Sequence, residues 1–419
     1  MPVSSSTRSP EAAIDLAQPD IMNERANSSL MRAIDAHKGG RLGEAEAGYR
    51  RILRKRPQDA DALNFLGMLY VQKGDASQGT QFLQRSVENL PTNPHAWLNL
   101  GNAHMVAGNL TSAKEAFGKA TELAPTMPEA WFNLGVCSRR LKHAEEALEC
   151  FRKAVEYGPG HAAAYEAMGS ILYRAGQFAE AADVYRQWLQ HEPESAFARH
   201  MLAATSGENV PVRADDDYLT DLFDKFASSF DENLHELGYR APQLLADALA
   251  KRIGFPTDAE ANRDILDAGC GTGLCAPLLR PMARTLVGVD ISAGMTEKAR
   301  ERGGYDELVV AELSSFMRER PAAFDVVISA DTLVYFGSLR EPLAAARLCL
   351  RDGGLLAFTV ERLESEELYR ILPHGRYGHS EGYVRAALAE AGFRDMSLDQ
   401  VVLRRERGED VVGLLVVAT

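Results

Sequence analysis

The stretch "ILDAGCGTGLCAPLL", Ile265 to Leu279, places three evenly spaced glycines directly after a short apolar run that ends in an acid. Glycine rows between a strand and a helix bind nucleotides, because backbone amides without a neighbouring Cβ can approach the ligand closely. A dinucleotide fingerprint, G-x-G-x-x-G, needs its third glycine at the sixth position. Here the glycines are Gly269, Gly271 and Gly273, and Leu274 holds the sixth position.

Two acids indicate which nucleotide the loop binds. Asp267 stands two residues before the first glycine, where its negative charge opposes a pyrophosphate and suits a cationic ligand. S-adenosylmethionine carries an ammonium and a sulfonium and no phosphate. Asp290 ends the next apolar run, "TLVGVD", where an acid can accept both hydroxyls of a ribose, a feature that dinucleotide sites share. The loop therefore favours S-adenosylmethionine, with a nicotinamide oxidoreductase as a distant alternative.

The sequence around this loop alternates between strand and helix patterns. Apolar runs read "DILDA", "TLVGVD", "ELVVAE", "FDVVISA" and "GLLAFTVE", with helical stretches between them, and two helices are expected before the first. This alternation predicts a parallel sheet with helices on both faces. The last segment, "MSLDQVVLRRERGEDVVGLLVVAT", predicts an antiparallel hairpin with a charged turn at Gly408.

"LDAGCGTG" together with "VGVDIS" resembles the class I S-adenosylmethionine-dependent methyltransferases, over Tyr218 to Thr419. The resemblance implies a Rossmann-like seven-stranded domain that ends in an antiparallel hairpin. It places Asp267 and the three glycines around the methionine portion and Asp290 at the ribose. It also implies cofactor contacts, in part around the adenine, for Ile291, Met295, Glu312 (where the family usually has Asp), Leu313, Ala330 and Tyr239.

The acceptor side is expected after the fourth and fifth strands. "SADTLVYF", Ser329 to Phe336, lacks the Asn/Asp-Pro-Pro-aromatic run of methylases that act on amino groups of bases or glutamine, so transfer to oxygen is favoured over nitrogen. Asp331 and Tyr335 are predicted to face the transferred methyl, although Asp331 could instead cap the next helix.

A glycine-rich segment, "PHGRYGHSEGY", follows the fifth strand and supplies a second set of candidates. His379 is the first candidate for a general base, because its ordinary pKa lies near neutrality. Tyr377 is a further catalytic candidate, and His374 a substrate-binding one. The alternative reading is a surface or helix-capping histidine.

The first half repeats every 34 residues. The rows begin at Ala26, Ala60, Pro94, Pro128 and Ala162, with a small residue at the eighth position, a large one at the twenty-fourth and proline at the thirty-second. "AWLNLGNAH" and "AWFNLGVCS" resemble the tetratricopeptide repeat (TPR) family, over about Ala26 to Pro193 in five repeats. The resemblance implies an α-solenoid of helix pairs, and Ala196 to Ala203 is expected to close the stack.

Arrays of this family bind peptides or proteins in a concave groove. Asn99 and Asn133 share the sixth repeat position, so their carboxamides are candidates for binding an extended peptide backbone; the alternative is that they are consensus residues only. Self-association into a homo-oligomer is left open.

Composition excludes several classes. The net charge is -13, most of it in the second half, which argues against nucleic-acid partners. No apolar run is long enough to cross a membrane. The five cysteines form no metal-binding spacing, so no metal is expected and a cytoplasmic location is favoured.

The predicted organisation is a disordered tail (1–25), a TPR domain with a capping helix (26–204), a linker (205–217) and a methyltransferase domain (218–419). The whole chain resembles a bacterial branch in which a methyltransferase follows TPRs. We therefore expect an S-adenosylmethionine-dependent methyltransferase whose array recruits a peptide or protein. The alternatives are a small-molecule methyltransferase whose array serves assembly, and a scaffold that binds the cofactor without chemistry.

Overall fold

The computed structural model describes residues 24–253, 262–406 and 408–419. Residues 1–23 of the predicted tail (1–25) lie outside the described residues. The described residues form two compact units. One contains residues 24–177 and 190–192, and the other contains residues 178–189 and 193–419.

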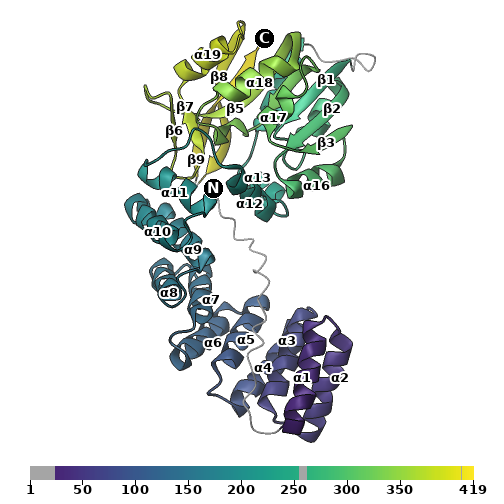
Figure 1. Cartoon of the computed structure of the whole chain (residues 1–419), viewed down its shortest axis with the longest axis vertical. Coiled ribbons are helices and arrows are strands. Elements are labelled where there is room, and N and C mark those ends of the chain that lie inside the picture. Colours follow the sequence, from purple (N-terminus) through teal and green to yellow (C-terminus); the bar gives the residue numbers. More distant parts are fainter. Residues whose placement is uncertain (1–23, 254–261, 407) are drawn as a thin grey trace. The chain divides into compact units, whose positions relative to one another are not determined.

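Ten helices follow the five sequence rows, and four of the rows begin at the first residue of a helix. They are α1 (Glu24–Lys38), α2 (Leu42–Lys55), α3 (Ala60–Gln72), α4 (Ala76–Asn89), α5 (Pro94–Val106), α6 (Leu110–Leu123), α7 (Pro128–Arg140), α8 (Ala144–Tyr157), α9 (Ala162–Arg174) and α10 (Phe178–His191) (Figure 1). The predicted closing helix is α11 (Ala196–Ser206).

The small and large repeat positions meet between the two helices of a repeat. A Cβ added to Gly101 of α5 would lie 2.4 Å from Phe117 of α6, and one added to Gly135 of α7 would lie 2.7 Å from Phe151 of α8. Only glycine permits this approach, because the aromatic ring occupies the space that a side chain would need. The repeat spacing therefore predicted both the helices and the contacts that hold each pair together.

The second unit carries the sheet. Besides most of α10 and all of α11, its helices are α12 (Asp216–Phe226), α13 (Phe230–Glu236), α14 (Ala241–Ile253), α15 (Ala276–Leu279), α16 (Ala293–Arg302), α17 (Leu313–Arg318), α18 (Arg340–Cys349) and α19 (Glu381–Glu390), with short 3-10 turns at Arg280–Met282 and Leu333–Tyr335. Its strands are β1 (Arg263–Ala268), β2 (Ala283–Asp290), β3 (Glu307–Val310), β4 (Phe324–Ser329), β5 (Leu350–Arg362), β6 (Tyr369–Ile371), β7 (Tyr377–His379), β8 (Met396–Glu406) and β9 (Glu409–Ala418).

The sheet has the predicted parallel centre and antiparallel end. Strands β3, β2, β1, β4 and β5 are parallel neighbours in that order, and β9 then pairs antiparallel with β5 and β8. A short β6–β7 hairpin adds two strands to the seven expected. Glu361 pairs with both Gly378 of β7 and Gly413 of β9, so these two strands lie on opposite edges of β5.

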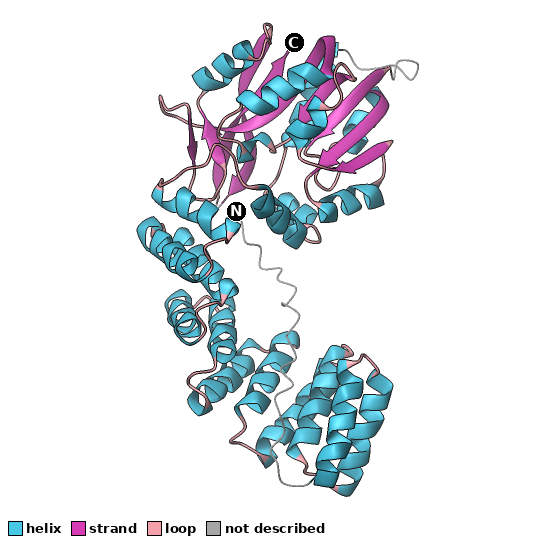
Figure 2. Ribbon diagram, viewed as in Figure 1, coloured by secondary structure: helices cyan, strands magenta, loops and turns pink. Residues whose placement is uncertain are grey.

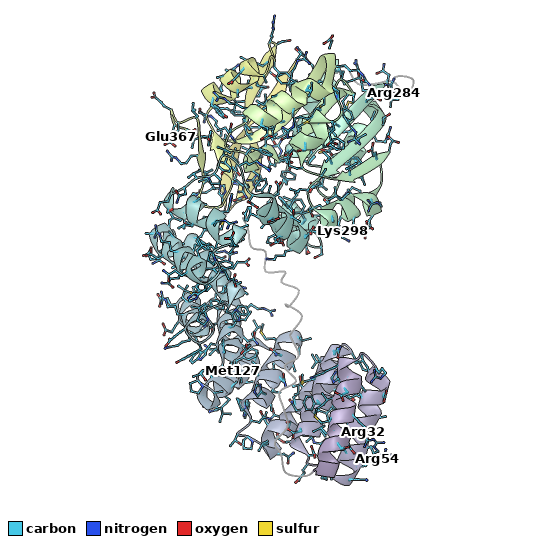
Figure 3. The ribbon with its side chains drawn as sticks, in the orientation of Figure 1. Arg32, Arg54, Met127, Arg284, Lys298 and Glu367 are labelled. Atoms are coloured by element: carbon cyan, nitrogen blue, oxygen red, sulfur yellow. The ribbon has the colours of Figure 1, made fainter. Side chains whose placement is uncertain are left out.

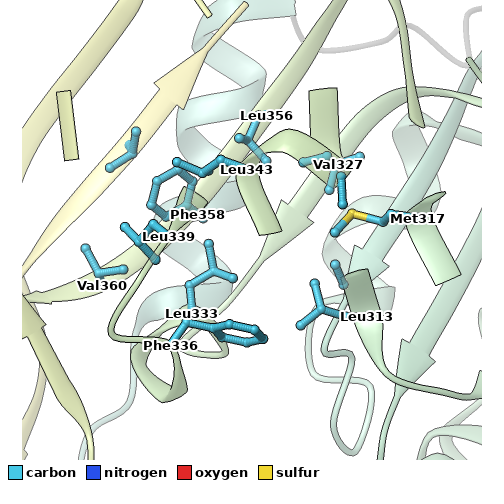
Figure 4. Packing of buried hydrophobic residues seen from close by; sticks show 14 of the residues in the cluster. Leu313, Met317, Val327, Leu333, Phe336, Leu339, Leu343, Leu356, Phe358 and Val360 are labelled. Atoms are coloured by element: carbon cyan, nitrogen blue, oxygen red, sulfur yellow. The ribbon is translucent and has the colours of Figure 1, made fainter. Parts of the chain in front are cut away.

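Helices cover both faces of the sheet (Figure 2). Along β1, Ile265 packs into a cluster with α14 and α15, whereas the next residue, Leu266, packs into a cluster with α17, α18 and α19. This alternation follows from the two-residue period of a strand. Figure 4 shows part of the second cluster, where Leu343 of α18 lies near Leu356 and Phe358 of β5.

Many charged side chains lie on the outside of each unit. Figure 3 labels Arg32 and Arg54 on the first helix pair, and Arg284 and Glu367 on the sheet-containing unit, all four of them exposed.

Between the predicted linker and β1 the structure describes three helices, α12, α13 and α14, rather than the two expected. The first of these helices ends at Phe226, and the second ends shortly before Gly238. Gly238 has a φ of 60°, in the left-handed region that glycine adopts at low cost. The predicted linker also makes defined contacts, since the amides of Gly337 and Ser338 donate to the carbonyl of Val212. This segment is therefore tied to the loop that follows β4.

Candidate functional site

The glycine loop after β1 is shaped by its neighbours. Gly269, Gly271 and Gly273 all have φ between 54° and 84°, a conformation that side chains rarely adopt. A Cβ on Gly269 would lie 2.1 Å from Oγ1 of Thr332, in the loop after β4. The three glycines are therefore required by backbone conformation, and Gly269 also by the close approach of a second loop.

Asp290, at the end of β2, joins the loop to the next helix. Its Oδ2 accepts a hydrogen bond of 2.9 Å from the amide of Gly271, and its Oδ1 accepts one of the same length from the amide of Ser292. Burial raises the pKa of Asp290, although these amides oppose the shift. The carboxylate thus lies at the carboxyl edge of the sheet, as predicted.

Asp267 lies beneath the loop and is fully buried. Its Oδ2 accepts a 2.6 Å hydrogen bond from the hydroxyl of Tyr305, while its Oδ1 accepts no N–H or O–H bond from the described residues. The negative charge of Asp290 and the weakly donating thiol of Cys275 also act on this carboxylate, in opposite directions. Burial raises the pKa of Asp267 to about 7, so this carboxyl binds a proton more tightly than an ordinary aspartate does.

A cavity of about 190 Å³ opens beside this loop at the carboxyl edge of the sheet. Of the residues predicted to contact the cofactor, Asp267 and Gly273 are absent from its lining: Asp267 lies below the loop, and Gly273 packs against Tyr305 and Ala299. The predicted residues that do line the cavity are Gly269, Gly271, Asp290, Ile291, Met295, Glu312, Leu313, Ala330 and Tyr239.

Glu312 has a structural task as well. Its two carboxylate oxygens accept hydrogen bonds from the amides of Ser314 and Ser315, which caps the start of α17. Burial would raise its pKa, but these donors prevail and lower it, so Glu312 is ionised. The cofactor end of the cavity therefore carries the carboxylates of Asp290 and Glu312, with that of Asp267 beneath the loop.

The apolar wall of the cavity comes from α12 and α13, and the sequence interpretation largely missed it. Phe223, Phe226 and Phe230 line the cavity, with leucines from the same two helices around them. Two acids fasten these helices over the loop: Asp224 of α12 accepts from the hydroxyl of Ser292 and Asp231 of α13 from that of Thr272.

Asp331 and Tyr335, the residues predicted to face the transferred methyl, also line the cavity. Asp331 has a φ of 52°, an unusual conformation for a residue with a side chain and one that clusters at functional sites. Its Oδ1 accepts from the hydroxyl of Thr359 and its Oδ2 from Nη1 of Arg404, so neither oxygen caps a helix. Burial raises the pKa of Asp331, and Arg404 opposes that shift.

Asp331 belongs to a buried ionic cluster of five residues. The other four are Glu361, Arg376, Arg404 and Glu406. Arg404 is 4% exposed and contacts all three carboxylates. Arg376 is 6% exposed and donates to Glu361 through Nε (2.5 Å) and to Glu406 through Nη2 (2.6 Å). Burial alone would raise the pKa of Glu361, but the arginines hold it well below its usual range.

The three candidates of the glycine-rich segment lie outside the cavity lining. His379 is fully buried, its Nε2 donates to the carbonyls of Phe336 and Gly337, and burial lowers its pKa to about 4. Tyr377 donates to the carbonyl of Pro211. His374 contacts Glu361 through Nε2 at 3.2 Å, and burial lowers its pKa to about 4.

These positions correct the expected roles of His379, Tyr377 and His374. All three side chains are committed to backbone or ionic partners, and none lines the cavity as the transfer of a proton from an acceptor would require. Arg376, in the middle of the same segment, is the residue that reaches the cavity and that the sequence interpretation overlooked. The signal in the sequence that could have indicated Arg376 was a charged residue in a short glycine-rich loop.

Asn99 and Asn133 are bound to neighbouring repeats in the array. Nδ2 of Asn99, which is 7% exposed, donates to Oδ1 of Asn64, and Nδ2 of Asn133 donates to Oδ1 of Asn102, both at 3.1 Å. Each pair joins consecutive repeats. The burial of Asn99 limits its access to a peptide, whereas Asn133 is half-buried.

No group of three or more His, Cys, Asp or Glu side chains among the described residues could hold a metal ion. None of the helices that the structure describes is long and apolar enough to cross a membrane.

Comparison with known proteins identifies both parts of the chain. Residues 6–219 match the family described as the Cilia and flagella-associated protein 70 C-terminal domain, and residues 266–358 match the family described as a methyltransferase domain. The second match contains the glycine loop, Asp290 and Asp331.

Individual relatives agree with the second assignment. Methyltransferase-like protein 27 of Homo sapiens is 37% identical over 27% of this chain and 45% of its own length. Malonyl-[acyl-carrier protein] O-methyltransferase of Geobacter sulfurreducens is 34% identical over 32% of this chain and 57% of its own length. The chain thus spans about half the length of these curated relatives.

A crystal structure of MamA protein covers 42% of this chain and 96% of its own, with a TM-score of 0.38 and 23% identity. The chain as a whole is a fusion of TPRs with a methyltransferase domain, and through residues 6–219 it belongs to the Cilia and flagella-associated protein 70 C-terminal domain family.

Proposed function

We propose that the methyltransferase domain uses S-adenosylmethionine and that the TPR array recruits a peptide or protein as the methyl acceptor. The observation that carries the cofactor assignment is the charge around the glycine loop. Three acids, Asp267, Asp290 and Glu312, outnumber Arg213, whose Nη1 lies 3.9 Å from Glu312. This end of the cavity therefore favours a ligand that carries positive charge and no phosphate group. The partnerless oxygen of buried Asp267 fits an ammonium group.

In this proposal each carboxylate has a separate task. Asp290 accepts the ribose hydroxyls, Glu312 lies at the adenine end, and Asp267 faces the amino group from below the loop. When bound, S-adenosylmethionine supplies a methyl group on a sulfonium, which is already activated toward displacement. The chain then has to hold the acceptor in line, exclude water with the phenylalanines of α12 and α13, and accept a proton where the acceptor carries one.

Asp331 is the proposed proton acceptor in place of His379. Its carboxylate lines the cavity, its backbone is strained, and burial raises its pKa toward the range in which a carboxylate can act as a base. We favour an oxygen acceptor, because the residues after β4 lack the motif of amino-group methylases and the names of several relatives describe O-methyltransferases. The five free cysteines accord with action in the cytoplasm.

Calorimetry with S-adenosylhomocysteine tests the cofactor. We expect micromolar binding to the full chain, a loss of at least about tenfold in Asp290→Asn, and no binding of NADH. Asp306→Asn is the matched control, because Asp306 also accepts an amide hydrogen bond beside β2 but does not line the cavity. Failure of the unaltered protein to bind S-adenosylhomocysteine would refute the assignment.

Labelled S-adenosylmethionine in host lysate tests recruitment. The full chain should label a peptide or protein, and removal of residues 1–177 should abolish that labelling while S-adenosylhomocysteine still binds. The cut falls before Phe178, because α10 and α11 belong to the compact unit of the methyltransferase domain. Unchanged labelling by the shortened chain, or label only in metabolites, would favour a small-molecule acceptor and an array used for assembly.

A further inference from the structure

In the ionic cluster of the acceptor side, one nitrogen atom of Arg376 makes no hydrogen bond to the described residues. Arg376 employs Nε and Nη2 on Glu361 and Glu406, while its Nη1 makes no hydrogen bond to any described residue. The same side chain lines the cavity. Two N–H groups of a buried guanidinium therefore remain available to an oxygen of a molecule in the cavity, and a hydrogen bond from a charged donor is among the stronger ones.

Arg376 is carried by a short loop, Leu372 to Tyr377, that has little regular structure of its own. Within it the amide of Leu372 donates to the carbonyl of Arg376, and the amide of Gly375 donates to the carbonyl of Leu372, each at 2.8 Å. Gly375 has a φ of 88°. Such a tight turn needs support from outside, since its own two hydrogen bonds do not fix where the arginine lies.

That support comes from α11, the helix that follows the last repeat. Nε2 of His200 donates to the carbonyl of Gly375 at 2.7 Å, and His200 is 3% exposed. Its ring stacks on Tyr218, with centroids 4.1 Å apart and planes at 21°. A Cβ on Gly375 would lie 3.3 Å from Sδ of Met201, so the loop fits closely against the helix.

The position of α11 is itself well defined within this unit. Phe197, near its start, contacts the rings of Trp188 on α10 and Tyr218 on α12. Tyr377, next to Arg376, donates to Pro211 just after α11. Helix, loop and ionic cluster thus form one continuous set of contacts from the end of the repeats to the cavity.

We propose that Arg376 binds an oxygen of the methyl acceptor and that His200 is the positioning residue that holds the Arg376 loop in place, so that the closing helix of the array is part of the acceptor site. The proposal rests on the methyltransferase function proposed above. It assigns the acceptor a hydrogen-bond-accepting group, such as a carbonyl or carboxylate, near the reacting atom.

Three full-length variants test the positioning role through hydrogen–deuterium exchange of the peptide that covers Leu372–Tyr377. His200→Phe keeps the ring stacking and removes the donor, and it should raise exchange at least tenfold. His200→Gln retains an N–H near the position of Nε2 and should restore exchange to within threefold of the unaltered protein. His37→Phe is the control, because His37 is an equally buried, hydrogen-bonded histidine in the first repeat, and it should leave this peptide unchanged.

The same proteins are then compared in one binding assay and one methyl-transfer assay. S-adenosylhomocysteine affinity should stay within twofold in His200→Phe, while methyl transfer to the lysate acceptor should fall at least tenfold and recover in His200→Gln. Arg376→Lys should also lower transfer. If the unaltered protein does not bind S-adenosylhomocysteine, the proposed function fails, yet the exchange data still decide the role of His200. Unchanged exchange, or unchanged transfer, in His200→Phe overturns the proposal.

Discussion

The two ends of the cavity are built in different ways. At the cofactor end, backbone atoms of one strand-loop-helix segment form the surface, and Asp290 fixes the loop through amide hydrogen bonds. At the acceptor end, side chains from β5, β8 and two separate loops form a buried ionic cluster around Arg404. The shape of the first end depends on steric fit of the main chain, and the shape of the second depends on the balance of charges. Changes at the two ends should therefore fail in distinguishable ways.

Removal of a charge from the cluster should have the largest effect. In Arg404→Met three carboxylates lose their shared partner inside the protein, and breaking one partner of a buried ion pair costs about 3–5 kcal/mol. Denaturant unfolding of the full chain measures it, through the transition of the sheet-containing unit. The adjacent Arg405→Met is the control: Arg405 is 68% exposed and pairs with Asp410, so it should cost less than about 0.5 kcal/mol.

A similar loss of stability in the two variants would contradict the distinction drawn between the ends. It would mean that solvent screens the charges of the cluster as it screens those of a surface ion pair. A second readout separates the ends further, because Arg404→Met should lower S-adenosylhomocysteine affinity far less than it lowers stability.

Substitution in the glycine loop should have the next largest effect and should act on binding first. Gly269→Ala adds a Cβ that meets Thr332 and also takes an unfavourable φ of 84°. We expect a loss of about 2–4 kcal/mol in stability and at least about a hundredfold in S-adenosylhomocysteine affinity. Gly353→Ala has a comparable φ of 70° but no atom within 4 Å of the added Cβ, so it isolates the conformational part.

Gly353→Ala should lose about 1–2 kcal/mol in stability with unchanged affinity. If Gly269→Ala binds S-adenosylhomocysteine as well as Gly353→Ala does, the fit of the loop against Thr332 is unimportant. The comparison between a steric and an electrostatic end would then need revision.

The same difference explains what the sequence could predict. The helices of the array and the cofactor end are encoded by local spacing: rows of 34 residues begin at Ala60, Pro94, Pro128 and Ala162, which are also the first residues of their helices. The glycine loop and Asp290 lie within one short stretch. Local periodicity and backbone conformation can be inferred from neighbours in the chain.

The acceptor end depends on contacts between distant segments. Arg404 is 43 residues from Glu361 and 73 from Asp331. Strict alternation along β8 would expose one of Leu403 and Arg404, but a register shift between Val402 and Arg404 lets both be buried. His379 was predicted as a base from its ordinary pKa, which burial then lowers to about 4.

The smallest expected effect is the pH dependence of S-adenosylhomocysteine affinity, which tests the cofactor end of the cavity. Burial raises the pKa of Asp267 to about 7, and a cationic ligand binds its ionised form. S-adenosylhomocysteine affinity should therefore weaken at least about tenfold as pH falls from 7.5 to 5.5, because protonation of this carboxyl competes with binding. Burial also raises the pKa of Asp290, which acts in the same direction. Asp267→Asn should bind more weakly at pH 7.5 and lose most of the pH dependence.

Stability of the ligand-free protein should respond to the same group with the opposite sign. The pKa of Asp267 is higher in the folded protein than its ordinary value, so the folded state binds the proton more tightly than the unfolded chain. Its contribution to stability is complete below about pH 4 and is lost as pH rises through about 7. Comparing unfolding of the unaltered protein with Asp267→Asn across this range isolates that contribution. The unaltered protein should lose stability relative to Asp267→Asn as pH rises through this range. If it instead gains stability relative to that variant, the folded protein favours the ionised carboxylate and the raised pKa of Asp267 is refuted.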